Sequence, residues 1–320
     1  MSASKIAVYA ENALGPANID PVSPATKKAG WTTIILGLFH IGYPPEWGNA
    51  EIFFNDTSII KDGVYRGDPA WPAKVAQLKE DSPITQIYAS IGGGYPVVDF
   101  TTIKTIYEEN KKSFDGTMLQ KNLQEFRHKF PKIDGIDMDC EDCYDHDSFV
   151  AFCKMMIGME FAITFCPAFK STMAFWVKSL KALEDSPDEK SKGRTVKYKG
   201  AVKWWNLQCY AGGGGNKPEE WAKAITDEIL GFSTDGFILA SDWARFWDPE
   251  LKDWDGNCPP AVKQHISGFS NPACLGGAFI WNMDAILETE RDPRQPCGSK
   301  GSMADYVQAI RQAMQPVAPS

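Results

Sequence analysis

Ile133-Asp-Gly-Ile-Asp-Met-Asp-Cys-Glu-Asp142 is the most informative stretch of this 320-residue sequence. The segment Ile133–Asp139 has the character of a buried β-strand, and side chains along a strand alternate between its two faces. Asp137, Asp139 and Glu141 therefore share one face, whereas the apolar residues between them share the other. We predict a buried strand that ends in a row of three carboxyl groups.

Seven further short apolar runs resemble this strand, and segments with a helical pattern separate many of them. In chain order, the eight predicted strands are Ile6–Ala10, Thr32–Phe39, Ile84–Ile91, Ile133–Asp139, Phe161–Cys166, Val202–Tyr210, Gly236–Ala240 and Gly276–Trp281. Strands that alternate with helices pair in parallel, because parallel pairing needs long crossovers. This pattern predicts an α/β protein with a closed (β/α)8 barrel, a TIM barrel. A doubly wound open sheet is the alternative, but Ala10–Gly15 lacks its glycine-rich fingerprint.

The segments between the strands complete the predicted barrel. The predicted helices are Pro72–Lys79, Leu119–Phe130, Ser148–Met156, Ala174–Leu183, Pro218–Ile229, Pro260–Gly268 and Met303–Met314. The first crossover, Gly15–Gly30, is short and rich in proline, so we expect a degenerate first helix. Glu51–Gly67 is expected to be an inserted hairpin. Because no linker or repeat is visible, we predict that residues 1–320 form a single catalytic barrel domain.

The three carboxyl groups of the row carry the predicted chemistry. Carboxylates buried side by side cannot all ionise freely, so at least one should keep its proton to an unusually high pH. Glu141 stands last, at the carboxyl end of the strand, where barrel enzymes place their active sites. A carboxylic acid there suits a general acid that protonates a leaving oxygen. The neighbouring Asp142, Asp145, His146 and Asp147 leave open a metal-binding or solvated acidic stretch.

The composition narrows the class of ligand. The net charge of −8 argues against nucleic acid or an anionic membrane surface as a partner, since both attract basic patches. No apolar run is long enough to span a membrane. Eleven Trp, eighteen Phe and ten Tyr suit both a core and the stacking of rings on a flat, neutral ligand. The four His lie scattered, and we expect no metal and no cofactor.

The eight cysteines divide into two groups. Those predicted to be mostly buried free thiols are Cys140, Cys143, Cys153, Cys166 and Cys209. Cys258, Cys274 and Cys297 lie in segments rich in Pro and Gly and are the disulfide candidates. No signal peptide precedes the first strand, so either a leader was removed or the protein is made without one. We expect a secreted, extracellular protein, with a cytoplasmic location as the alternative.

Asp134-Gly-Ile-Asp137-Met-Asp139-Cys-Glu141 resembles the Asp-x-x-Asp-x-Asp-x-Glu signature of glycoside hydrolase family 18, which includes chitinases and endo-β-N-acetylglucosaminidases. Ser90-Ile-Gly-Gly93 is similar to the Ser-x-Gly-Gly motif of that family, and Gln208-Cys-Tyr210 to the Gln-x-Tyr pattern of its small single-domain members. Trp281 matches the Trp that floors the sugar site, and Ile6-Ala-Val-Tyr9 resembles the family's first strand. The resemblance covers nearly the whole chain.

The resemblance implies a retaining hydrolase that cleaves β-1,4 bonds after N-acetylglucosamine. Glu141 would act as general acid and then as base, Asp139 would orient the 2-acetamido group of the sugar, and Asp137 would support Asp139. The acetamido oxygen would attack the anomeric carbon, so that no carboxylate nucleophile is needed. Tyr210 would hydrogen-bond the acetamido group, and Trp281 would stack under the sugar ring.

Further residues are predicted to line this site. These substrate contacts are Tyr9, Gly92, Gly93, Gln208, Asp242 and Trp243. For Asp242 and Trp243, packing of the loop after the seventh strand is the alternative role. Ala211 stands where many family members have Asp or Asn, so one polar contact to substrate is missing. The stretch from Ala240 to Gly276 leaves no room for an α+β insertion between the seventh and eighth strands, which predicts a shallow groove and endo cleavage.

Three functions remain open at this level. The first is an endo-acting chitinase, or alternatively an endo-β-N-acetylglucosaminidase that acts on the chitobiose core of N-glycans. The second is a catalytically weak lectin-like protein that binds chitin or N-acetylglucosamine, but such members of the family usually have the acidic Glu replaced, and Glu141 is present. The third is a metal-dependent barrel hydrolase. We expect a monomer whose partner is an oligo- or polysaccharide containing N-acetylglucosamine.

Overall fold

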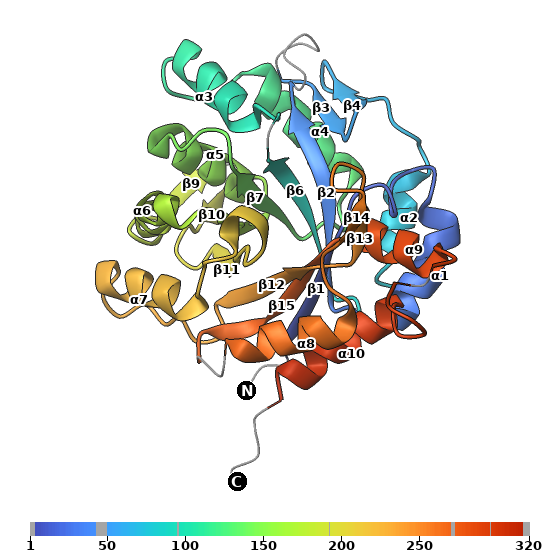
Figure 1. Cartoon of the computed structure of the whole chain (residues 1–320). Helices are drawn as coiled ribbons and strands as arrows, with labels where there is room; N and C mark the ends of the chain where they lie inside the picture. Colours follow the sequence, from blue (N-terminus) through green and yellow to red (C-terminus); the bar gives the residue numbers. More distant parts are fainter. Residues whose placement is uncertain are drawn as a thin grey trace.

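Parallel strands form a closed barrel at the centre of the molecule (Figure 1). The computed structural model describes residues 4–42, 50–94, 96–191, 193–269, 273–294 and 296–315. In these ranges the barrel strands are β1 (Lys5–Ala10), β2 (Thr33–Ile41), β6 (Gln86–Gly93), β7 (Gly135–Cys140), β8 (Ala162–Phe165), β11 (Val202–Asn206), β12 (Ile238–Trp243) and β15 (Leu275–Trp281). Each pairs in parallel with the next, and β1 also pairs with β15, which closes the barrel.

Helices surround the barrel and cover its outer face (Figure 1). They are α1 (Ile19–Ala29), α2 (Trp71–Gln77), α3 (Asp99–Glu109), α4 (Met118–Lys129), α5 (His146–Gly158), α6 (Met173–Glu184), α7 (Pro218–Glu228), α8 (Pro259–Gly268), α9 (Met283–Arg291) and α10 (Met303–Ala313), with short 3-10 turns η2 (Lys170–Thr172) and η3 (Ala211–Gly213). At least one helix follows every barrel strand. The predicted (β/α)8 barrel is confirmed, and each predicted strand overlaps one of its strands.

Strand β7 divides two layers of buried side chains. Its apolar residues Ile136, Met138 and Cys140 pack in the outer layer, between the strands and the helices. A second, smaller aromatic cluster fills the barrel itself and includes Tyr88 and Trp204, whose ring centroids are 4.8 Å apart. The alternation predicted for this strand is therefore confirmed on its outer face, and its carboxyl groups are directed into the barrel.

The first helix corrects the expectation of a degenerate crossover. α1 is continuous over 11 residues although Pro24 lies inside it. Pro24 removes one backbone hydrogen bond, but Val22 and Thr26 are buried on the same side of the helix, and that burial outweighs the cost. Gly30 ends the helix with a positive φ of 101°, a conformation that glycine adopts without strain.

Small antiparallel additions extend the barrel. The predicted insertion after β2 is a three-stranded meander of β3 (Ile52–Phe54), β4 (Thr57–Lys61) and β5 (Val64–Tyr65), which continues the sheet from β2. A second hairpin, β9 (Glu189–Ser191) and β10 (Arg194–Val196), lies between α6 and β11. Between β12 and β15, the described residues hold only the hairpin β13 (Phe246–Asp248) and β14 (Asp253–Asp255), besides α8 and loops.

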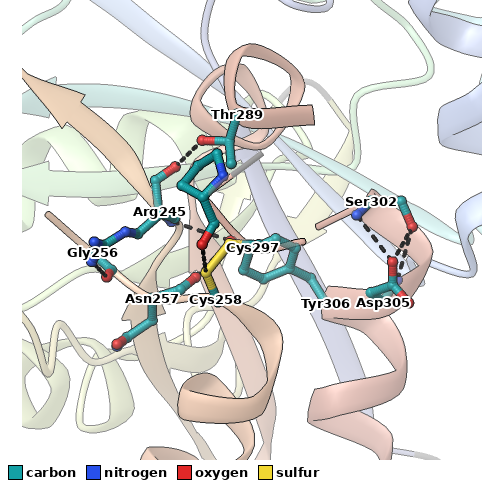
Figure 2. Close-up of a disulfide and its surroundings, with 10 residues drawn as sticks. Arg245, Gly256, Asn257, Cys258, Thr289, Cys297, Ser302, Asp305 and Tyr306 are labelled. Atoms are coloured by element: carbon teal, nitrogen blue, oxygen red, sulfur yellow. Dashed lines mark hydrogen bonds between the residues drawn. A yellow bond between two sulfur atoms is a disulfide. The ribbon is translucent and has the colours of Figure 1, made fainter. Parts of the chain in front are cut away.

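A disulfide fastens the carboxyl-terminal part of the chain (Figure 2). Cys258 at the start of α8 is bonded to Cys297 in the segment after α9. Hydrogen bonds tie the same region together, since the Tyr306 hydroxyl of α10 donates to the Asn257 carbonyl at 2.6 Å. Cys274, the third disulfide candidate, is a buried free thiol, because it lies just before β15 and packs in the outer layer.

We predict that replacing both Cys258 and Cys297 by Ser lowers the free energy of unfolding by about 3–4 kcal/mol, because the bond closes a loop and restricts the unfolded chain. The measurement is urea unfolding without reductant. Reduction should bring the wild type to the stability of the double variant and leave that variant unchanged. Equal stability of the oxidised wild type and the variant would contradict the disulfide.

Candidate active site

Strand β7 brings the predicted carboxyl row to the carboxyl end of the barrel. Asp137 and Asp139 are buried, and Glu141 follows the strand and is partly exposed. In the pairing of β6 with β7, Ser90 lies beside Asp137 and Gly92 lies beside Asp139. The partners of these carboxyl groups come from several strands around the barrel, so the row is directed into its interior.

Asp137 is surrounded by hydrogen-bond donors. Its donors, one each from β1, β6, β8 and β11, are Tyr9 Oη (2.7 Å), Ser90 Oγ (2.9 Å), Thr164 Oγ1 (2.6 Å) and Asn206 Nδ2 (2.9 Å). The Asn206 amide is oriented by Trp204 Nε1, which can only donate and gives its hydrogen to Asn206 Oδ1 at 2.9 Å. Burial raises the pKa of Asp137, and the four hydrogen bonds oppose that rise. Of the row, Asp137 is the group best equipped to hold a negative charge.

Asp139 and Glu141 form a coupled pair that shares one amide donor. Gln208 Nε2 lies 3.2 Å from Asp139 Oδ1 and 3.0 Å from Glu141 Oε1. Burial, followed by the charges of Glu141 and Asp137, raises the pKa of Asp139 well above its ordinary value. Burial also raises the pKa of Glu141, opposed by hydrogen bonds from Gln208 and Asp139. We infer that this pair retains a proton at a pH where ordinary carboxylic acids have lost theirs.

Four of the predicted aromatic residues gather around the row. The rings of Tyr210 and Trp243 stack at 5.7 Å with an interplanar angle of 21°, and those of Tyr9 and Trp281 lie 5.2 Å apart. Tyr9 and Tyr210 are buried, whereas Trp243 and Trp281 are partly exposed. Burial raises the pKa of Tyr210 well above its ordinary value, so its hydroxyl stays a donor.

Gly92 and Gly93 have a backbone role. Both have positive φ angles, 114° and 116°. A Cβ atom on Gly92 would lie 2.0 Å from the Asp139 carbonyl oxygen, and one on Gly93 would lie 2.7 Å from Leu38 Cδ1. Glycine is therefore required at Gly92 for the close approach of β6 to the backbone of β7, and at Gly93 by its positive φ. Contact with substrate stays a prediction for both.

Asp242 does not join the other predicted site residues. It lies on the face of β12 opposite to Trp243, because neighbouring residues of a strand point to opposite sides. Its carboxyl group is buried in the outer layer, where it accepts a hydrogen bond from Asn257 and lies 3.0 Å from His265 Nδ1. We therefore no longer assign Asp242 to the sugar contacts, whereas Trp243 belongs to the inner cluster.

Two of the acidic residues that follow Glu141 cap helices. Asp142 accepts hydrogen bonds from the backbone N–H groups of Phe100 (3.2 Å) and Thr101 (2.8 Å) in the first turn of α3. Asp145 is the N-cap of α5 and accepts from the Ser148 N–H at 3.0 Å. Within the described ranges, no group of three or more His, Cys, Asp and Glu side chains is placed to hold a metal ion. Helix capping accounts for these two carboxylates.

Three residues of the cluster were missed by the sequence reasoning. Thr164 and Asn206 bond Asp137, and Cys166 contacts Tyr9 and Gln208 inside the barrel. Thr164 lies on β8 and Cys166 directly follows that strand, two residues further on, so the alternation that marked the carboxyl row also marks this pair. The alternation rule, applied to the predicted fifth and sixth strands, was the signal in the sequence that could have identified these residues.

The fold and the site define a (β/α)8 barrel with a carboxylate cluster at the carboxyl ends of its strands. Among solved structures, the chain is similar to a GH18 chitinase, ChiB, from the chitin utilization locus of Flavobacterium johnsoniae (TM-score 0.56, 12% identity, 97% of this chain and 94% of that chain). It is also similar to a class V chitinase from Pseudomonas fluorescens Pf-5 (TM-score 0.54, 13% identity, 98% of this chain and 100% of that chain). At these identities the likeness establishes a shared fold.

The comparisons by sequence give no match. No protein-family model matches the chain, and no curated protein sequence matches it significantly. In the part of the chain that the structure describes, no helix is both long and apolar enough to cross a membrane.

We predict that Asp139→Asn stabilises the folded protein at neutral pH. Because the pKa of Asp139 is raised by folding, the wild type loses stability as pH rises from about 4, the unfolded value, toward the folded pKa. The variant lacks this loss, so its advantage in thermal unfolding should grow from pH 4 to pH 8. Asp227→Asn, in an exposed ion pair with Lys223, serves as the control and should show no such trend. A constant difference across pH would refute the prediction.

Proposed function

We propose that this chain is a retaining, substrate-assisted glycoside hydrolase that cleaves β-1,4 bonds after N-acetylglucosamine, acting within chains as an endo-chitinase. The observation that carries the proposal is that the three carboxyl groups of the row lie in different environments. Asp137 is held by four donors, whereas Asp139 and Glu141 share the single amide donor of Gln208 and have raised pKa values. Glu141 is the partly exposed member of the row and stands at the open end of the barrel.

The proposed reaction has two steps. Glu141 gives its proton to the glycosidic oxygen while the acetamido oxygen of the substrate attacks the anomeric carbon, so the glycosidic bond breaks and a five-membered ring forms. Positive charge spreads over the acetamido group, and ionised Asp139 stabilises it. Glu141 then takes a proton from water, the oxygen of which attacks the anomeric carbon and reopens the ring. Two displacements retain the configuration of the sugar.

The aromatic side chains support a carbohydrate substrate. Trp281 is partly exposed beside buried Tyr9, which suits a platform on which a pyranose ring stacks. The Tyr210 hydroxyl has no hydrogen-bond partner among the described residues, and we assign it to the acetamido group of the substrate. The short β13–β14 hairpin favours an open groove, and therefore cleavage inside a sugar chain.

The disulfide is informative about the compartment in which the protein functions. Disulfides persist in oxidising compartments and are rare in the cytosol. The bond between Cys258 and Cys297 thus supports a secreted protein over the cytoplasmic alternative.

We predict that Glu141→Gln lowers kcat/KM for chitin oligosaccharides by about a thousandfold, because Gln can neither donate nor accept the proton in transit. Reducing-end release is the measurement, run in parallel on a high-mannose glycoprotein. Glu228→Gln, in an exposed ion pair with Lys181, is the matched control and should keep full activity.

Each outcome of this experiment is decisive for one claim. Cleavage of the glycoprotein alone would move the assignment to an endo-β-N-acetylglucosaminidase. Binding of oligosaccharide without turnover by the wild type would identify a lectin-like protein. Activity that survives in Glu141→Gln would remove Glu141 from its role.

The acetamido group of the substrate provides an independent test of mechanism. We predict that oligosaccharides with free 2-amino groups in place of the acetamido groups are not cleaved, because they lack the attacking oxygen. Hydrolysis is followed by chromatography of the products. Turnover of such a substrate at a rate comparable to that of the acetylated one would eliminate the substrate-assisted route and call for a carboxylate nucleophile.

A further inference from the structure

The β13–β14 hairpin begins shortly after β12 ends at Trp243, so it stands at the open end of the barrel. Side chains on a hairpin alternate between its two faces, and residues paired across the strands share a face. Trp247 therefore lies beside Trp254 on one face, and Phe246 lies beside Asp255 on the other. The two faces have different surroundings.

The face with Trp247 and Trp254 is covered by the chain itself. The two ring centroids lie 5.6 Å apart, and the Arg294 guanidinium lies 4.4 Å from the first ring and 4.7 Å from the second. Arg294 is held in turn by Asp292, whose Oδ2 atom lies 2.7 Å from Arg294 Nη2. Intramolecular packing thus accounts for both tryptophans, and no ligand is needed to explain this face.

Hydrogen bonds fix the base of the hairpin relative to the barrel. The Asn257 N–H donates to the Trp243 carbonyl at 2.9 Å, and the Arg245 N–H donates to the Asn257 carbonyl at 3.1 Å. The Thr289 hydroxyl of α9 donates to the Arg245 carbonyl at 2.5 Å, as Figure 2 shows. The face with Phe246 is therefore held at a defined place beside Trp243.

The face with Phe246 continues the aromatic surface of the site. Trp243 lies opposite Trp281 in the pairing of β12 with β15. The Phe246 ring centroid lies 5.5 Å from that of Trp243, at an interplanar angle of 63°. All three side chains are partly exposed. A row of aromatic side chains therefore runs from Trp281 through Trp243 to the hairpin.

Asp255 adds a hydrogen-bond acceptor beside Phe246. It is partly exposed, and its Oδ1 atom accepts from the Gly256 N–H at 2.6 Å. Within the described residues, Asp255 forms no ion pair. A carboxylate accepts strong hydrogen bonds from hydroxyl groups. An aromatic ring next to such an acceptor suits a pyranose, which has apolar C–H faces and hydroxyl groups at its edge.

We propose that Phe246 and Asp255 form a further sugar subsite, which extends the substrate groove from Trp243 along the β13–β14 hairpin. Phe246 stacks against one more sugar unit of the bound chain, and Asp255 accepts a hydrogen bond from a hydroxyl group of that unit. Continuity of the aromatic row with Trp281 identifies the occupant as the substrate chain itself. The inference rests on the proposed function for the identity of that chain, an oligosaccharide of N-acetylglucosamine.

The test measures dissociation constants of N-acetylglucosamine oligosaccharides by calorimetry, with Glu141→Gln as the parent so that the ligand is not consumed. Phe246→Leu removes the ring but keeps an apolar side chain. It should raise the dissociation constant of the hexasaccharide about three- to tenfold and that of the disaccharide by a smaller factor, because a long chain reaches the hairpin. Phe246→Tyr keeps the ring and should bind the hexasaccharide as the parent does. Asp255→Asn should weaken hexasaccharide binding about two- to threefold.

Phe232→Leu is the matched control. Phe232 is also partly exposed, but it packs against Phe237 just before β12 begins, at the opposite end of the barrel. This variant should bind the hexasaccharide as the parent does. An equal loss of affinity in Phe232→Leu and Phe246→Leu, or an unchanged hexasaccharide constant in Phe246→Leu, would overturn the subsite.

Turnover by the wild type separates this inference from the proposed function. Loss of hexasaccharide affinity in Phe246→Leu, together with no turnover by the wild type, would overturn the hydrolase and support the subsite. Turnover by the wild type, together with an equal loss for both oligosaccharides in Phe246→Leu, would overturn the subsite alone. Should Phe246→Leu fail to fold, Asp255→Asn decides, and an unchanged hexasaccharide constant in that variant overturns the proposal.

Discussion

The carboxyl group of Asp137, buried at the centre of the barrel, sets the strongest constraint on this structure. A buried charge without partners is too costly for a folded protein to tolerate, so the donors must be present before the site exists. They come from four strands, β1, β6, β8 and β11, whose residues are up to 128 positions apart from Asp137 in the chain. A shift of any of these strands by one residue would turn its donor to the outer face. The polar centre thus fixes the register of the barrel.

The same strand creates two chemical environments one step apart. Moving along β7 by two residues takes a side chain about 7 Å toward the open end of the barrel. At that position Asp139 lies outside the ring of donors around Asp137, but the charge of Asp137 still raises its pKa. Glu141, two residues further on, is the member of the row that is partly exposed to solvent. Carboxyl groups whose environments push their pKa values apart are the usual basis for assigning acid and base roles. The gradient of donors and burial along one strand therefore produces the functional order of the row.

How far the sequence predicts this arrangement depends on the range of the interactions involved. Strand alternation is local, so the shared face of Asp137 and Glu141 could be predicted, and the barrel followed from the order of strands and helices. Helix α1 could not be predicted from the sequence, because its tolerance of Pro24 depends on burial against the rest of the molecule. Asp242 was misplaced because the predicted strand ends at Ala240, whereas β12 continues to Trp243 and alternation along it directs Asp242 and Trp243 to opposite faces. Alternation along the sixth strand could have placed Asn206 on the inner face, but no local pattern shows that it pairs with a carboxyl group 69 positions away.

The glycines at the end of β6 complete the site because they have no Cβ atom. Gly92 permits β6 to approach the backbone of Asp139, an approach that any Cβ atom would block. The chain continues into Gly94, where a Cβ atom would lie 3.7 Å from Glu141 Oε2. An alanine is compatible with that distance, but a longer side chain directed the same way would fill the space beside the proposed acid. The close pairing that places Asp139 and the open space that admits a sugar beside Glu141 are therefore consequences of the same short glycine run.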